Sequence, residues 1–314
     1  ADLLPAPITP AQAEEALRRN PDAAAVYVTS PDYFGKLTDI AGLAEVCRRY
    51  RVPLLVDNAH GAHLAFLPWR CHPIQLGADY CCDSAHKMLS GLTGTAYLHV
   101  RSDIDVEPER VRDAMAMFGS TSPSYLMLAS LDWCNRELAS PLFRKQLEEV
   151  LDRIQRLKCR FSPRYCFVDG DPMHLTIDAA AGGFHGLELA AYLEQHEVFV
   201  EYADAFHVVL LCSAANTDRD FDILEQLLER FSPTPAESGE KYALPRPEKV
   251  CGIREAALAP QEIVPIGESS GRICAAVKVP CPPAVPIVLS GERIDARCIA
   301  VCEAYGITEI SVVQ

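Results

Sequence analysis

The sequence predicts an α/β protein in which part of a mostly parallel sheet is flanked by helices. Short apolar segments, which lack the strict polar alternation of a half-buried strand, are separated by segments with apolar residues at helical spacing. Strands that are apolar on both faces are typical of a sheet covered on both sides. Of the 314 residues, 49% are hydrophobic and 23% are charged, a globular composition with room for two domains.

The first hundred residues carry most of this pattern. We expect one helix directly after Thr9, a suitable N-cap, and another over 40–50 after Asp39. Four apolar segments are predicted to be strands: 23–30, 52–59, 77–85 and 94–100. Residues 1–107 are therefore assigned to a large domain that contains this sheet.

The rest of the chain divides into four regions. Residues 108–160 have helical spacing and are predicted to be connecting helices. Residues 161–231 are predicted to form a small α+β domain, and the proline-rich residues 232–250 a linker. Residues 251–314 are predicted to be a C-terminal α+β element. The strands expected in the small domain are 174–178, 198–204 and 207–214.

Charge and cysteine content exclude several classes of protein. The net charge of −14 argues against binding to nucleic acid or to an anionic membrane surface. No apolar run reaches the roughly 20 residues that a membrane-spanning helix needs. The 13 cysteines have no framework spacing and form no CxxC pair. We therefore expect reduced thiols in a cytoplasmic protein, and no metal centre.

Polar side chains follow two neighbouring strands of the predicted sheet. They are Asp57, His60, His63, Ser84, His86 and Lys87. Because ligands of α/β proteins bind at the carboxyl ends of parallel strands, we expect these groups to line one crevice.

Together these groups suit pyridoxal 5′-phosphate (PLP). A lysine amine can condense with an aldehyde cofactor, and a carboxylate such as Asp57 keeps a pyridine nitrogen protonated. Hydroxyl and imidazole groups suit a phosphate. Taken singly, Asp57 could equally cap a turn and Lys87 could be a solvated loop lysine. His60 and His63 could be a metal pair, but no third ligand is evident, so the combination favours PLP.

Several segments resemble, in order, the signature blocks of the ornithine/lysine/arginine decarboxylase family of PLP enzymes. They are 29–40 (TSPDYFGKLTDI), 54–63 (LLVDNAHGAH), 77–100 (GADYCCDSAHKMLSGLTGTAYLHV), 121–132 (TSPSYLMLASLD) and 267–294 in the tail. That family has the aspartate-aminotransferase-like fold, known as fold type I. The resemblance covers nearly the whole chain.

The resemblance implies three catalytic residues. Lys87 would bind the cofactor aldehyde, Asp57 would pair with the ring nitrogen, and His60 would lie beside the ring near the lysine. Ala59 would pack on one face of the ring.

The resemblance also implies phosphate contacts and a shared site. Ser84 and His86 would contact the cofactor phosphate. Thr121 and Ser122 would reach the cofactor or substrate of a neighbouring subunit, because enzymes of this family build their sites across a dimer interface. The same loop could instead be an ordinary helix N-cap, and the two interpretations are compatible.

Some positions depart from the family pattern. Asn58 stands where the family usually has an acidic residue, and Met88 where it has threonine. Cys281 and Ala284 put the usual contribution of the tail to the active-site entrance in doubt. Family members also carry a long segment before the block at 29–40, with the phosphate-binding loop and the group stacked on the ring, and we expect this chain to lack both.

The resulting expectation is PLP-dependent decarboxylation of lysine, arginine or ornithine, as part of polyamine metabolism, by a homodimer or higher oligomer. Two alternatives stay open. One is another fold type I PLP enzyme, an aminotransferase or lyase, although no arginine clamp for a substrate carboxylate is evident. The other is a truncated, non-catalytic remnant or partner subunit.

Overall fold

The computed structural model describes residues 6–235, 244–277 and 286–314. The chain divides into two compact units, residues 6–235 and residues 236–314. Cys281 and Ala284 lie outside the described residues, as does part of the predicted linker.

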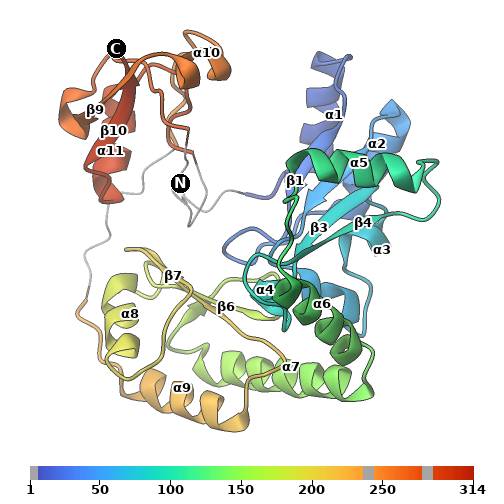
Figure 1. Ribbon diagram of the computed structural model, residues 1–314. Helices are drawn as coiled ribbons and strands as arrows, with labels where there is room; N and C mark the ends of the chain where they lie inside the picture. The colour runs from blue at the N-terminus through green and yellow to red at the C-terminus, as the bar shows by residue number, and fades with distance from the viewer. Residues whose placement is uncertain (1–5, 236–243, 278–285) are drawn as a thin grey trace. The chain divides into compact units, whose positions relative to one another are not determined.

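The first sheet has the strand order β1-β2-β3-β4 and is mostly parallel, as predicted (Figure 1). Its strands are β1 (Val26–Thr29), β2 (Leu54–Asp57), β3 (Tyr80–Ser84) and β4 (Ala96–Val100). Each is a few residues shorter than the predicted segment. Two one-turn helices flank β3: α3 (Pro73–Leu76) and α4 (Ala85–Met88). The first three strands are parallel, whereas β4 runs antiparallel to β3.

Two helices cover one face of this sheet. α1 (Pro10–Arg19) begins after Thr9, which forms a reciprocal capping box with the first turn and so confirms the predicted N-cap. α2 (Ile40–Tyr50) begins after Asp39, whose carboxylate accepts a backbone N–H of the first turn. The side chains buried between these helices and the strands are Ala13, Val28, Ile40, Leu43, Ala44, Cys47, Leu54, Val56 and Ala78.

The opposite face of the first sheet is largely open. Tyr27 is 62% exposed and Leu98 is 42% exposed. The register aligns Thr29, Asp57, Cys82 and Leu98 in one row across the four strands. Alternate residues of a strand point to opposite faces, so Asp57 stands on this open face. The expectation that helices flank both faces is not met by the described residues.

Two helices after the first sheet expose apolar side chains. α5 (Pro108–Phe118) buries none of its described side chains, and α6 (Tyr125–Leu138) buries Cys134 alone. The large exposed apolar residues on them are Met115, Met117, Phe118, Tyr125, Leu126, Leu128 and Trp133. Several large apolar side chains exposed on two successive helices favour an interaction site there over plain solvent-facing surface.

The second sheet lies beside a long helix, α7 (Pro141–Phe161). It has the order β5-β6-β8-β7, and all its neighbours are antiparallel. Of the expected strand 198–204, only Tyr202 and Ala203 form a strand. The short strand Cys166–Phe167, which follows α7, was not predicted. Its elements are β5 (Cys166–Phe167), β6 (His174–Asp178), β7 (Tyr202–Ala203), β8 (His207–Leu211), α8 (Gly186–Glu194) and α9 (Asp218–Arg230).

One hydrophobic core of the first unit links the segments that follow β2 and β3 to α7 and the second sheet. Leu64, in the 3₁₀ helix η1 (Ala62–Phe66), and Met88 belong to the same buried cluster as Leu147 of α7 and Leu175 of β6. Helix α7 is therefore part of this core, although the sequence suggested only a connecting helix. The boundaries predicted after residues 107 and 160 fall inside this unit.

The second unit has a small core of its own around Cys274, Ile294, Cys298 and Val312. Its two strands pair antiparallel. Its elements are α10 (Ile253–Leu258), β9 (Gln261–Pro265), η2 (Ile266–Glu268), α11 (Ala296–Ala304) and β10 (Glu309–Val313). Within the described parts of the whole chain, no helix is long and apolar enough to cross a bilayer.

Candidate active site

Lys87 and His60 are in direct contact at the ends of adjacent strands. Lys87 lies in α4, directly after β3, and His60 lies three residues beyond β2. Lys87 Nζ lies 2.8 Å from His60 Nε2. Burial, assisted by the charge of Lys87, lowers the pKa of His60 to about 3. The imidazole is therefore neutral near pH 7, and its Nε2 accepts a hydrogen bond from the lysine amine.

The other nitrogen of His60, Nδ1, is buried and has no hydrogen-bond partner in the part of the chain that the structure describes. An unpaired buried polar atom costs free energy, so this atom is available to hydrogen-bond a group bound beside the ring. The ring packs edge-on against Tyr33, at 4.8 Å between ring centroids, and lies 5.7 Å from the ring of His174.

A buried aspartate in the connection between β5 and β6 holds two histidines beside this pair. His63 Nε2 donates to Asp171 Oδ1 at 2.8 Å, and His174 Nδ1 donates to Asp171 Oδ2 at 2.9 Å. Burial alone would raise the pKa of Asp171, but the charge of His63 and the hydrogen bonds from both histidines hold it well below its ordinary value. His63 thus pairs with a carboxylate, not with His60 as a metal pair.

Asp57 is held in one orientation on the open face of the first sheet. Its Oδ1 accepts the backbone N–H of Ala59 at 3.0 Å, and its Oδ2 accepts the hydroxyl of Tyr27 at 3.0 Å. Desolvation and the Asp57 charge raise the pKa of Tyr27 to about 12, so this phenol stays a neutral donor. Ser84 ends β3 on the same face, two residues beyond Cys82, the partner of Asp57 in the register.

The remaining predicted site residues lie in two places. His86 Nδ1 donates to the carbonyl of Thr95 at 3.0 Å, which fixes its ring near the start of β4. Thr121 and Ser122 are exposed in the loop between α5 and α6. The hydrogen bond described for that loop is local, from Ser122 N–H to Ser120 Oγ at 3.1 Å. These two residues are not brought to Lys87 within the chain.

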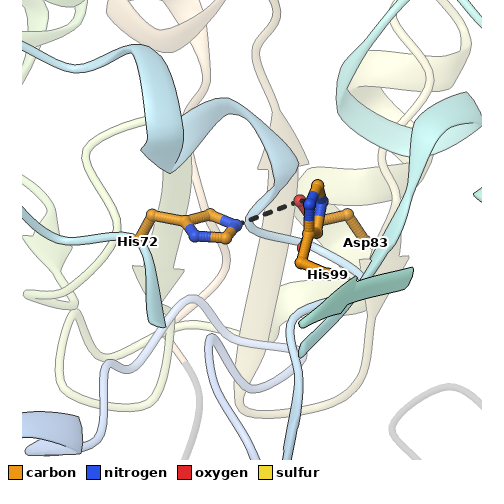
Figure 2. Close-up of side chains that lie close together, drawn as sticks. All are labelled: His72, Asp83 and His99. Atoms are coloured by element: carbon orange, nitrogen blue, oxygen red, sulfur yellow. Dashed lines mark hydrogen bonds and ion pairs between the residues drawn. The ribbon is translucent and has the colours of Figure 1, made fainter. Parts of the chain in front are cut away.

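A second polar cluster, which the sequence did not suggest, consists of His72, Asp83 and His99 (Figure 2). Asp83 and His99 alternate along their strands with the exposed Cys82 and Leu98, so they lie on the covered face of the first sheet. His72 and His99 approach the same carboxylate oxygen, Asp83 Oδ2, through their Nε2 atoms. Asn58 Nδ2 donates to the other oxygen, Asp83 Oδ1, at 2.7 Å. The departure at Asn58 has a physical reason here, since an acidic residue would place a second buried carboxylate against Asp83.

Comparison of the chain with known protein families identifies its family. Residues 4–169, more than half of the chain, match the family described as "Orn/Lys/Arg decarboxylase, major domain". The chain belongs to the Orn/Lys/Arg decarboxylase family. Residues 249–304 match the C-terminal domain of the same family. The family predicted from the sequence blocks is thereby confirmed.

Curated relatives of the chain come from bacteria. It is 32% identical to the uncharacterized protein YaaO of Bacillus subtilis over 91% of its own length. It is also 32% identical over 93% of its length to an arginine decarboxylase of B. subtilis. The chain spans only 62% and 64% of the lengths of these two relatives.

Solved structures confirm the predicted α/β fold. The E. coli constitutive lysine decarboxylase matches with a TM-score of 0.74 at 16% identity, covering 98% of this chain and 61% of that one. Lysine decarboxylase A of Pseudomonas aeruginosa matches with a TM-score of 0.75 at 17% identity, covering 98% of this chain and 61% of that one.

Proposed function

We propose that this chain supplies the lysine-bearing part of a PLP-dependent decarboxylase that converts lysine, arginine or ornithine to the amine and carbon dioxide. The observation that carries the proposal is the contact between Lys87 and the neutral, buried His60 in a chain of this family. The relatives named arginine decarboxylase support a basic amino acid as substrate.

The described side chains fit PLP. The amine of Lys87 would bind its aldehyde, the oriented carboxylate of Asp57 would meet its ring nitrogen, and Ala59 would pack on its ring. Ser84 and His86 would contact its phosphate. The unpaired Nδ1 of His60 supports the fit, because it leaves a buried polar atom available to a bound group. When bound, the cofactor would supply a protonated ring that accepts the electron pair left on the substrate carbon as carbon dioxide departs.

Side chains of this chain would keep the ring nitrogen protonated and supply the proton that replaces the carboxylate. Asp57 keeps the ring nitrogen protonated, and Tyr27 and Ala59 hold that carboxylate in place. Lys87 Nζ would give a proton to the carbon that has lost its carboxylate, and His60 Nε2 would orient the lysine amine by accepting its hydrogen bond.

The proposal includes a homodimer with shared active sites. The exposed apolar side chains of α5 and α6, among them Phe118 at 92% and Tyr125 at 88% exposure, support an interface there. Thr121 and Ser122 lie in the loop between these helices, so an interface on them would bring the loop to the partner's site.

We place the enzyme in the cytoplasm, within polyamine metabolism. The described cysteines are all free thiols, which supports a reducing compartment.

The test is a visible absorption spectrum of the purified chain with added PLP, followed by borohydride reduction. Wild type should show a reducible band, and mass spectrometry should place the added mass on the peptide that contains Lys87. The variant Lys87→Ala should lose the band, whereas Lys145→Ala, which removes an exposed helix lysine, should keep it. Equal labelling in both variants would overturn the assignment.

Product analysis with lysine, arginine and ornithine then separates the reactions. Release of carbon dioxide with the corresponding amine supports decarboxylation. Formation of an oxo acid would instead favour an aminotransferase. A labelled chain that turns over none of the three would favour a non-catalytic subunit.

A further inference from the structure

The cluster of His72, Asp83 and His99 has the composition of a metal-binding site. The three side chains come from the residue before α3, from β3 and from β4, and they converge in Figure 2. Their ligand atoms all lie within 4.8 Å of one another. The cluster lies on the covered face of the sheet, opposite Asp57, and has no part in the reaction proposed above.

The two oxygens of Asp83 are used differently. Oδ2 lies 3.1 Å from His72 Nε2 and 3.0 Å from His99 Nε2. Oδ1 accepts hydrogen bonds from Asn58 Nδ2 at 2.7 Å and from Cys81 Sγ at 3.3 Å. Oδ2 thus faces the two imidazoles, while Oδ1 is held by hydrogen bonds from Asn58 and Cys81. A carboxylate that ligates a metal is commonly supported in this way.

The carboxylate also needs a positive charge. Asp83 is only 3% exposed. In the described part of the chain, its ion-pair partners are these two histidines, which are neutral unless protonated. A buried carboxylate is costly unless a cation balances it. Either a proton on one imidazole or a metal ion can do so.

We propose that His72 Nε2, His99 Nε2 and Asp83 Oδ2 bind one Zn²⁺-like divalent transition-metal ion. Imidazole and carboxylate together suit zinc, with water as a fourth ligand. Ligand distances of about 2.0–2.1 Å would separate the ligand atoms by roughly 3.3 Å, close to the two oxygen–nitrogen distances observed. The His99 side chain is 40% exposed, so it can move to bring its Nε2 closer to His72 Nε2. The same exposure leaves a route by which the ion can enter.

The proton balance of binding is simple. Without the ion, the Nε2–H groups of both histidines donate to Asp83 Oδ2. On binding, each neutral imidazole exchanges this proton through solvent for one on Nδ1 and gives the lone pair of Nε2 to the metal, while Asp83 binds as the carboxylate. If one histidine is imidazolium beforehand, binding releases that proton. The ion would tie α3, β3 and β4 together, and Asp83 precedes Lys87 by four residues, so the ion would fix the end of β3 from which the lysine follows.

Equilibrium dialysis of the chelator-treated 314-residue chain against ZnCl₂ tests the proposal. We expect one ion per chain, and binding weakened at least about tenfold in His99→Ala and in Asp83→Asn. The control His196→Ala removes an exposed imidazole outside the cluster and should bind as wild type does. Zn²⁺ should also raise the unfolding temperature of wild type, since it binds the folded chain.

A Co²⁺ absorption spectrum of wild type tests the ligand set without any variant, so the test stands even if a variant does not fold. Visible bands of a four-coordinate nitrogen and oxygen site, without a thiolate charge-transfer band, support the proposal. A thiolate band would place the ion on cysteines and overturn it. Binding well below one ion per chain, or equal binding in wild type and both variants, would also overturn it. None of these readouts depends on PLP or on turnover.

Discussion

At the scale of single residues, the imidazole of His60 has contacts from three directions. Lys87 approaches Nε2, Tyr33 packs on the ring, and His174 lies nearby from the second sheet. Asp171 and His63 complete the group of titratable side chains around it. Since His60 is buried and its pKa is lowered to about 3, it resists protonation at a pH where an exposed histidine is half charged.

His60 should make the folded state sensitive to acid. An unfolded histidine titrates near pH 6.5, so between about pH 6.5 and 3 the unfolded chain binds a proton that the folded chain refuses. Stability therefore falls as the pH falls through this window. From pH 7.5 to 4.5 we expect His60 to contribute a loss of about 2–3 kcal/mol.

Urea unfolding of wild type and His60→Asn across this range measures the effect. The variant cannot titrate at this position, so its stability should depend less on pH. His196→Asn, at an exposed position, should keep the wild-type slope. Parallel slopes for wild type and His60→Asn would refute the expectation.

At the scale of elements, one loop after β1 connects the two sheets of the first unit. The carbonyl of Gly35 accepts the backbone N–H of Asp171 at 2.7 Å. Gly35 has φ +85°, and a Cβ there would lie 2.5 Å from Cβ of His174. Only glycine allows the two backbones to approach so closely beside the aspartate that holds His63 and His174.

Gly35→Ala should therefore destabilise the first unit by about 2 kcal/mol or more, because it adds a left-handed backbone penalty to a steric clash. Gly267→Ala is the matched control, since a Cβ at that position meets nothing within 4 Å. Thermal unfolding compares the two. Similar unfolding temperatures for both variants would contradict the packing described here.

The direction of β4 shows what the sequence could and could not predict about elements. Its apolar pattern correctly indicated a strand, because burial determines that pattern. The pattern carries no direction, so the prediction of a mostly parallel sheet did not say that β4 would be the antiparallel strand. The short connection between β3 and β4 could have indicated the antiparallel direction, since a parallel crossover needs about a dozen residues or more.

The candidate site was predictable only where its residues are local in sequence. Asp57, His60 and Lys87 follow strand ends, and the structure brings His60 and Lys87 together. His174 begins β6 and Asp171 precedes that strand, and tertiary packing alone brings them to His60. The sequence spacing around Asp171 and His174 does not indicate that they lie close to His60.

At the scale of the whole molecule, the exposed apolar helices α5 and α6 should determine the oligomeric state. Burying such side chains in an interface is favourable at about 25 cal/mol per Å² of apolar surface. Phe118→Glu combined with Tyr125→Glu should shift the chain from dimer to monomer, because both side chains are almost fully exposed in one copy.

Sedimentation velocity of wild type and the double variant gives the answer. Leu258→Glu is the control, since Leu258 is 75% exposed and belongs to the second unit. A double variant that stays dimeric would exclude this surface as the interface. A monomeric wild type at the same concentration would exclude the dimer.

The shared core of the first unit also limits how this gene can be recombined. Leu64 and Met88 pack in the same buried cluster as the residues of α7 and the second sheet. A second sheet exchanged for that of a distant relative would bring differently shaped side chains to these two positions, and well-packed cores tolerate such mismatches poorly. The two sheets should therefore be inherited together, so that a crossover between residues 88 and 147 survives only when the incoming core complements the resident one.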